Sequence, residues 1–184
     1  PDKYGYDEHY TNCNSAKKLT CPRHQSSEVI IDKAIEFIEK YRDENFYLNL
    51  WTLVPHSVLD PTEEQMEAFK HYEPWEPAKE RGFTTVQQVY CATVGDLDKQ
   101  IGRLLRKLDE MGLSDNTIVA FSSDNGPEDI HILPVGHSGF GSQGPFRGRK
   151  RSLYEGGIRV PFIVQWKGHI EAGRVDNESI IGAV

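Results

Sequence analysis

The apolar run at residues 117–121 is followed by a carboxylate and an amide, and this pairing constrains the fold more than any other feature of the sequence. Asp124 and Asn125 come soon after the run, and Gly126 and Pro127 then turn the chain. A short β-branched run is typical of a buried strand, and open α/β sheets bind ligands at the carboxyl ends of such strands. Carboxylate and amide oxygens suit a hard cation such as Ca²⁺ or Mg²⁺. We therefore predict a strand that ends at a metal site, although these residues taken alone are more often a plain turn.

Strand and helix patterns alternate along the rest of the chain. Apolar residues recur at helical spacing over residues 26–41 and, most clearly, over 85–111. Residues 46–54 and 158–166 have the apolar character of buried strands. This alternation predicts an α/β fold with a mostly parallel central sheet flanked by helices. The long glycine-rich segment 126–148 is expected to be a functional loop.

The composition limits the classes of protein to consider. With 184 residues, the chain is long enough for one domain with a core, or for part of a larger domain. Its 28 acidic residues outnumber its 21 basic ones, which argues against a general nucleic-acid binder, and its apolar runs are too short to span a membrane. Cys13, Cys21 and Cys91 have no metal-binding spacing, and their odd number disfavours a disulfide framework.

Three further positions carry side chains suited to catalysis. His56 comes at the end of the predicted strand 46–54, Lys150 lies in a basic, glycine-rich turn, and His137 lies in the long loop. Each alone has an ordinary explanation as a surface or loop residue. With the predicted metal site they form a consistent set, because a lysine ammonium binds an oxyanion and a histidine can give a proton to a departing alkoxide. We therefore predict hydrolysis of a sulfate or phosphate ester, with these side chains converging at one edge of the sheet.

Several motifs follow one another at a specific spacing. They are Tyr-Gly-Tyr-Asp-Glu at 4–8, the run ending in Pro-His at 46–56, the helical segment 90–105, Ser-Asp-Asn-Gly-Pro at 123–127, Gly-Pro-Phe-Arg-Gly-Arg-Lys at 144–150 and Tyr-Glu-Gly-Gly-Ile-Arg-Val-Pro at 154–161. In this order they resemble the central part of a type I sulfatase of the alkaline phosphatase superfamily. The resemblance implies an alkaline-phosphatase-like α/β fold. It also implies that residues 1–184 are the central part of a sulfatase catalytic domain, truncated at both ends.

The resemblance gives a role to each candidate residue that matches a motif. Asp124 and Asn125 would be ligands of the family's divalent cation, Ca²⁺ or Mg²⁺, Lys150 would hold the sulfate, and His56 would contact the bridging ester oxygen and protonate the leaving group. His137 matches no motif position and is kept as a candidate substrate contact. The expected substrate is a sulfated small molecule or a sulfated carbohydrate. The resemblance also suggests a periplasmic, secreted or lysosomal protein.

One part of the family's machinery has no counterpart in the sequence. The formylglycine nucleophile is made from Cys or Ser in the pentad Cys/Ser-x-Pro/Ala-x-Arg, and Cys21-Pro22-Arg23 has the residue types but the wrong spacing. We expect the nucleophile upstream of this chain, and no sulfatase turnover from residues 1–184 alone. Two alternatives stay open: a phosphate or phosphonate ester hydrolase of the same superfamily, and a non-catalytic sulfatase-like module.

Overall fold

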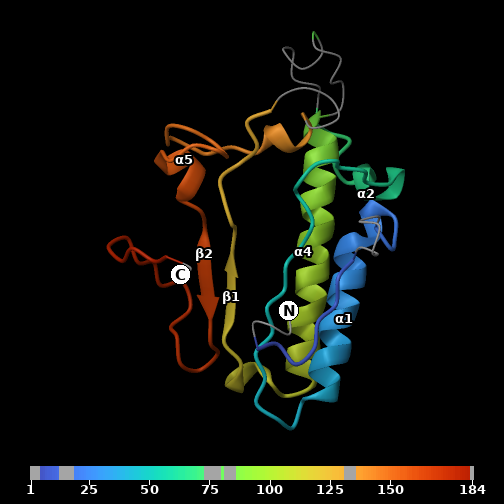
Figure 1. The fold of residues 1–184 in the computed structure, drawn as a ribbon, viewed down its shortest axis with the longest axis vertical. Helices are drawn as coiled ribbons and strands as arrows, with labels where there is room; N and C mark the ends of the chain where they lie inside the picture. The colour runs from blue at the N-terminus through green and yellow to red at the C-terminus, as the bar shows by residue number, and fades with distance from the viewer. Residues whose placement is uncertain (1–4, 13–18, 73–79, 81–85, 131–135, 183–184) are drawn as a thin grey trace.

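The computed structural model places a group of helices beside a two-stranded sheet (Figure 1). The residues that it describes are 5–12, 19–72, 80, 86–130 and 136–182. The helical region consists of α1 (Ser26–Lys40), α2 (Glu63–Glu67) and α4 (Val86–Glu110). The sheet region comprises residues 119–165, with β1 (Val119–Ser122) and β2 (Phe162–Gln165). The remaining short helical elements are η2 (Arg23–Gln25), η3 (Ser114–Asn116), η4 (Ser138–Phe140) and α5 (Glu155–Ile158), of which η4 and α5 lie between β1 and β2 in the sequence.

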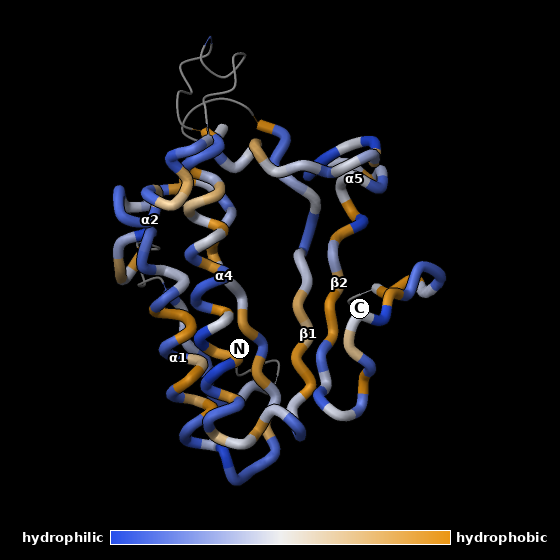
Figure 2. Tube along the Cα trace, turned by 180° about the vertical axis from the view of Figure 1, so that it is seen from behind, coloured by the Kyte–Doolittle hydropathy of each residue, from blue (hydrophilic) through white to orange (hydrophobic). Residues whose placement is uncertain are grey.

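The main core lies between α1 and α4, which pack side by side in Figures 1 and 2. On α1 the side chains of Ile31, Ala34 and Ile38 are buried, at the three- and four-residue spacing of one helix face. The side chains that α4 buries are those of Val86, Val89, Ala92, Thr93, Leu97, Gln100 and Leu108. Both predicted helices are confirmed: α1 begins at the expected residue and ends one residue before its expected end, and α4 also ends one residue before its expected end.

Local capping explains where two of these helices begin and end. After α4, Gly112 adopts a φ of +70°, and the Leu113 N–H donates to the carbonyl of Leu108 at 2.9 Å. This is the glycine-terminated arrangement that satisfies the last carbonyls of a helix. At the start of α2, the Thr62 hydroxyl accepts from the Gln65 N–H at 3.2 Å, and the Gln65 side-chain oxygen accepts from the Thr62 N–H at 2.8 Å. Such a reciprocal capping box fixes the first turn of a helix.

The sheet is an antiparallel pair, in which Val119 lies opposite Gln165 and Ser122 lies opposite Phe162. The predicted strand at 117–121 is confirmed as β1 with shifted bounds, and the predicted strand at 158–166 is confirmed as β2, which starts after Pro161. No other sheet is found among the described residues. The mostly parallel arrangement that the alternating pattern predicted is therefore not seen in this part of the chain.

Residues 46–54, which were predicted to form a strand, run alongside α4 without a strand partner in the described part of the chain (Figure 1). Exposure alternates along them as it does along a strand: the side chains of Tyr47 and Trp51 are 73% and 82% exposed, whereas Val54 is 6% exposed. A strand exists only through hydrogen bonds to a neighbour. The apolar pattern therefore predicted the surface of this segment, but it could not predict which backbone lies beside it.

Apolar residues lie on both strands as well as on the helices (Figure 2). Those of the strands are largely exposed, with Phe121 at 44%, Phe162 at 46% and Ile163 at 59%. Among the described residues, no helix combines the length and the apolar character that crossing a membrane requires. Cys21 and Cys91 are free thiols, and Cys13 lies outside the described residues.

Candidate active site

The turn that follows β1 presents the predicted metal ligands. Its shape is fixed by Ser122, whose hydroxyl donates to the Pro161 carbonyl at 2.9 Å, and by Ser123, whose hydroxyl donates to the Asn125 carbonyl at 3.0 Å. The Asp124 side chain is exposed and forms no hydrogen bond or ion pair with any described residue. Its carboxylate is therefore open to a ligand from outside the described part of the chain.

Asn125 and Asp124 together offer oxygens of the kind that a hard cation binds. The Asn125 side-chain nitrogen donates to the Gly126 carbonyl at 2.8 Å, so its side-chain oxygen is the atom left for a ligand. A Ca²⁺ ion takes about six to eight oxygen ligands. Within the described residues, no group of three or more His, Cys, Asp or Glu side chains is arranged to hold a metal. The donor type fits Ca²⁺ or Mg²⁺, but most of the ligands would have to come from elsewhere.

A glycine-lined backbone junction ties this turn to the segment that carries Lys150. The Gly126 N–H donates to the Gly157 carbonyl at 2.8 Å, and the Lys150 N–H donates to the Pro127 carbonyl at 2.9 Å. A Cβ atom placed on Gly126 would lie 1.9 Å from the Gly156 carbonyl oxygen, which no side chain can tolerate. The glycines thus let two backbones touch, and the contact brings Asp124 and Asn125 beside the Lys150 segment.

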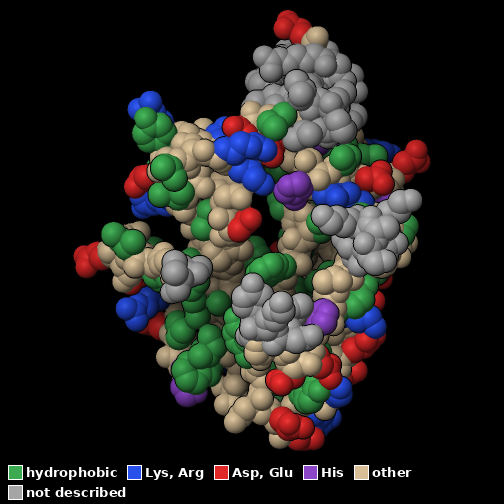
Figure 3. Space-filling model, in the orientation of Figure 1, with side chains coloured by type: hydrophobic (Ala, Val, Ile, Leu, Met, Phe, Trp, Pro, Cys, Tyr) green, Lys and Arg blue, Asp and Glu red, His purple; other side chains and the backbone are tan. Residues whose placement is uncertain are grey.

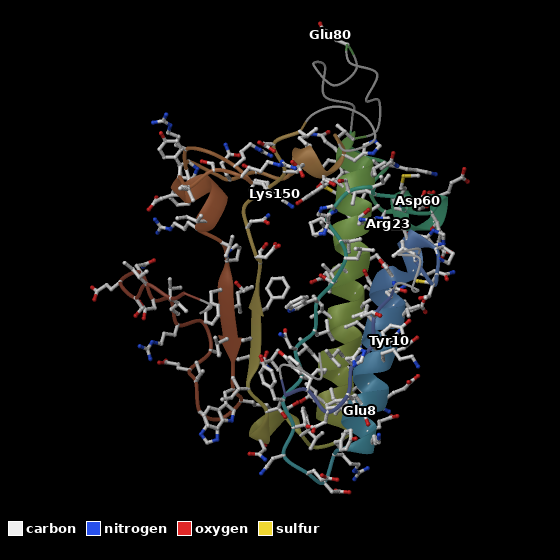
Figure 4. All side chains as sticks on the ribbon, viewed as in Figure 1. Glu8, Tyr10, Arg23, Asp60, Glu80 and Lys150 are labelled. Carbon is white, nitrogen blue, oxygen red and sulfur yellow. The ribbon has the colours of Figure 1, made fainter. Side chains whose placement is uncertain are left out.

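Lys150 lies at the carboxyl end of β1 in Figure 4, on the loops above the strand. Its side chain is half-buried, and its ammonium has no ion-pair partner among the described residues. Figure 3 shows Lys, Arg and His side chains on the upper part of the molecule, with Asp and Glu side chains beside them. A lysine ammonium without a carboxylate partner suits an anionic ligand.

His56 belongs to the helical region and is held by Arg23. The Arg23 guanidinium donates to the carbonyls of His56 and Ser57 at 2.5 and 2.7 Å. Nδ1 of His56 lies 2.8 Å from the Ser57 carbonyl oxygen, which can only accept, so Nδ1 carries the proton of this hydrogen bond. The residue is exposed, and its Nε2 has no hydrogen-bond partner among the described residues. Burial lowers the pKa of Arg23, against the opposing charge of Asp60 (both labelled in Figure 4).

His137 occupies the residue before η4, in the loop that the sequence marked as functional. Its imidazole is half-buried, and this burial lowers its pKa. The following Phe140 packs edge-on against Tyr90 of α4, with ring centroids 5.6 Å apart. This aromatic contact joins the loop to the helical region.

The structure thus brings together some of the predicted site residues and not others. Asp124, Asn125 and Lys150 lie on two segments that are hydrogen-bonded to each other. No hydrogen bond or ion pair among the described residues joins His56 to either segment. The segment that carries His56 nevertheless ends toward the same end of the molecule as β1 does in Figure 1. The role of each residue stays a prediction.

Sequence reasoning missed the side chains that hold the loop around Lys150. Glu128 is buried, and its Oε1 accepts from the Asp129 and Ile130 N–H groups at 2.9 and 3.2 Å and from the Arg151 guanidinium. The Arg151 guanidinium is the main reason that the pKa of Glu128 falls from its ordinary value of 4.5 to about 2. The sequence feature that could have indicated this support is the pair of arginines on either side of Lys150. From the sequence alone these residues were interpreted as a solvated basic turn.

A family model described as sulfatase matches residues 1–181. The chain is 43% identical to mouse steryl-sulfatase over 86 residues, which cover 47% of this chain and 14% of that protein. It is 30% identical to human N-acetylgalactosamine-6-sulfatase over 152 residues, which cover 83% of this chain and 26% of that protein. The chain therefore spans about a quarter or less of the length of these relatives.

Solved structures give the same answer for the fold. The crystal structure of Ps i-CgsB in complex with k-i-k-neocarrahexaose matches with a TM-score of 0.65 and 28% identity, over 80% of this chain and 29% of that one. The PsFucS1 sulfatase from Pseudoalteromonas sp. matches with a TM-score of 0.60 and 29% identity, over 82% of this chain and 26% of that one. These likenesses confirm the α/β, alkaline-phosphatase-like fold class and the family resemblance that the motifs indicated.

Proposed function

This chain belongs to the sulfatase family, and we propose that the whole protein hydrolyses sulfate monoesters. The observation that carries the proposal is the glycine-lined junction, which sets two metal-type oxygen ligands beside a lysine with no carboxylate partner in the described part of the chain. Relatives named for a steroid sulfate and for an amino-sugar sulfate support a sulfated small molecule or a sulfated carbohydrate as the substrate.

The chain's own residues would divide the work by charge and by proton transfer. The Lys150 ammonium would pair with the sulfate oxygens and offset the negative charge that builds up on them. In its imidazolium form, in which both ring nitrogens carry a proton, His56 would give the Nε2 proton to the bridging ester oxygen as the alkoxide leaves, and Nδ1 would keep its bond to the Ser57 carbonyl. Asp124 and Asn125 would hold Ca²⁺ or Mg²⁺, and such a cation supplies charge stabilisation to the transferring group. His137 would contact the substrate from the neighbouring loop.

We propose that the nucleophile is supplied by a part of the protein other than these 184 residues. No stretch of the sequence has the Cys/Ser-x-Pro/Ala-x-Arg pattern from which formylglycine is made. We therefore propose that this chain supplies the sulfate-binding lysine, the histidine and part of the metal shell, and that residues 1–184 alone do not turn over a sulfate ester.

Replacing Lys150 tests this function in the whole protein, matured so that formylglycine can form. With a chromogenic aryl sulfate, we expect Lys150→Ala to lower kcat/KM by about a hundredfold to a thousandfold, the range for loss of one charge-stabilising group. The matched control is Lys99→Ala, which removes an exposed lysine from α4. An aryl phosphate of the same alcohol serves as the competing substrate. Faster hydrolysis of the phosphate, or an effect of Lys150→Ala no larger than that of the control, would contradict the proposal.

A further inference from the structure

The side chain of Arg149 binds four points of one loop. Its Nε donates to the Glu128 carbonyl at 2.9 Å, and its Nη1 donates to the side-chain oxygen of Gln143 at 2.5 Å. Its Nη2 donates to the carbonyls of Gly139 and Gly141 at 2.8 and 2.5 Å. Hydrogen bonds from a charged donor are about twice as strong as neutral ones, so these bonds hold the loop firmly.

Only an arginine can make this set of bonds. A guanidinium presents five N–H groups in a fixed plane, and four of them are used here on acceptors spread over residues 128–143. A lysine ammonium keeps the charge but has three donors around a single nitrogen. It cannot reach all four acceptors at once. Replacing Arg149 by lysine therefore keeps the positive charge but removes the planar set of four hydrogen bonds.

The bonded loop lies between α4 and the segment that carries Lys150. Around Gly141, a Cβ atom would lie 2.9 Å from the Tyr90 hydroxyl oxygen and 3.0 Å from the Cβ of Pro127, so the loop touches both. Burial raises the pKa of Tyr90, while the nearby charge of Arg149 opposes this rise. The Pro127 carbonyl in turn accepts from the Lys150 N–H at 2.9 Å. Loop, helix and lysine segment therefore form one connected unit around the Arg149 guanidinium.

A second arginine holds the same loop from the other side of Lys150. Arg151 bonds the carboxylates of Glu128 and Asp129, at the start of the loop. Lys150 thus lies between two arginines whose side chains both bind the loop. Its own ammonium has no ion-pair partner in the described part of the chain. Arg149 and Arg151 therefore support the loop, and the Lys150 ammonium between them stays available to bind a ligand.

We propose that Arg149 is a positioning residue, which fixes the loop 136–143 against α4 and so sets the wall of the substrate site beside Lys150. The proposal rests on the proposed sulfatase function, because it takes Lys150 as the group that binds the sulfate. Without the four bonds, the loop and its histidine at 137 would no longer hold one position relative to the lysine. A misplacement of about 1 Å can cost a hundredfold in rate.

The test compares Arg149→Lys and Arg149→Gln with the wild type in the whole protein. Arg106→Lys and Arg106→Gln are the matched controls, since Arg106 is an exposed arginine on α4. Hydrogen exchange of peptides within 136–148 measures how firmly the loop is held. We expect exchange there to rise at least about tenfold in both Arg149 variants, with unchanged exchange in α1 and with no change in the controls.

Kinetics with an aryl sulfate then separate positioning from simple support of the fold. We expect both Arg149 variants to lower kcat by about tenfold to a hundredfold, with a smaller change in KM and with little change in the melting temperature. Unchanged exchange, or faster exchange with kcat within twofold of the wild type, would overturn the proposal. If the wild type hydrolyses no sulfate ester but hydrogen exchange of the loop still rises in both Arg149 variants, the proposed sulfatase function is wrong. The role of Arg149 in holding the loop is then still supported.

Discussion

The helical region and the sheet region are held together in different ways. In the helical region, α1 packs on α4 and buries its own Ile31, Ala34 and Ile38. Ion pairs such as that of Lys107 with Glu39, at 2.7 Å, join the two helices. In the sheet region, both strands are largely exposed, and the firm contacts are made by glycine backbones and by arginine side chains. One region is stabilised by apolar burial and the other by close backbone contact and charge.

This difference matches what each region is expected to do. Apolar burial supplies stability, but it is non-directional and does not by itself orient a functional group. Hydrogen bonds and backbone contacts fix direction, which the placement of a lysine beside metal ligands requires. The predicted binding groups Asp124, Asn125 and Lys150 all lie in the region of directional contacts. We therefore expect substitutions in the core between α1 and α4 to affect stability first, and those in the sheet region to affect activity first. The exposed His56 is the exception in the helical region, because its proposed role is in proton transfer.

The largest effect on stability is expected from Ile31→Ala in the whole protein. Ile31 is fully buried at 0% exposure, and removal of its side chain leaves a cavity that the neighbouring helix cannot fill. We expect the free energy of unfolding to fall by about 3 kcal/mol, as measured by urea denaturation. Ile31→Val is the graded control and should cost about 1 kcal/mol. Equal costs for the two variants would mean that the core between α1 and α4 is not the close packing described.

A smaller loss of stability, but a larger loss of activity, is expected from Gly126→Ala. The added methyl group would lie 1.9 Å from the Gly156 carbonyl oxygen, so the two segments must move apart. We expect a cost of about 2 kcal/mol in stability, as for other overpacked sites, and loss of most sulfatase turnover. Gly182→Ala is the control, because a Cβ atom there meets nothing within 4 Å. Full turnover by Gly126→Ala would break the proposed link between the junction and the site.

The helices could be predicted from the sequence because their signals are local. The apolar spacing over α4 and the capping residues lie within one stretch of chain, and the observed bounds agree with the expected ones. The strands could be predicted only in part, since a strand needs a partner from elsewhere in the chain. β1 and β2 were found, but their antiparallel pairing was not foreseen, and the segment 46–54 has the strand pattern without a partner among the described residues.

The candidate site divides in a similar way. Asp124, Asn125 and Lys150 could be named because they lie in short motifs, and the structure places their segments in contact. The support around them could not be named, because it depends on which carbonyls a guanidinium meets. Arg149 illustrates this: in the sequence it is one charge in a basic turn, whereas in the fold it joins four points of a loop.

The smallest expected effect comes from Glu128→Gln, and it separates charge from hydrogen bonding in the sheet region. The Glu128 side chain is 7% exposed and bonds the Arg151 guanidinium, which is the main cause of its lowered pKa. A glutamine keeps the oxygen that accepts from the backbone but removes the charge. We expect the free energy of unfolding at neutral pH to fall by about 1–2 kcal/mol.

The pH dependence of this difference shows whether the charge is responsible. The folded-state pKa of about 2 lies below the ordinary value of 4.5, so the carboxylate adds stability that is complete above about pH 4.5 and is lost as the pH falls toward about 2. The gap between wild type and Glu128→Gln in urea denaturation should therefore narrow between about pH 5 and about pH 3. Glu155→Gln, which removes an exposed carboxylate 3.4 Å from Arg159, should show little gap at either pH. If the stability difference between wild type and Glu128→Gln stays constant over this range, the contribution of Glu128 comes from its backbone hydrogen bonds and not from its charge. The contacts of the sheet region would then depend less on charge than the arginine contacts suggest.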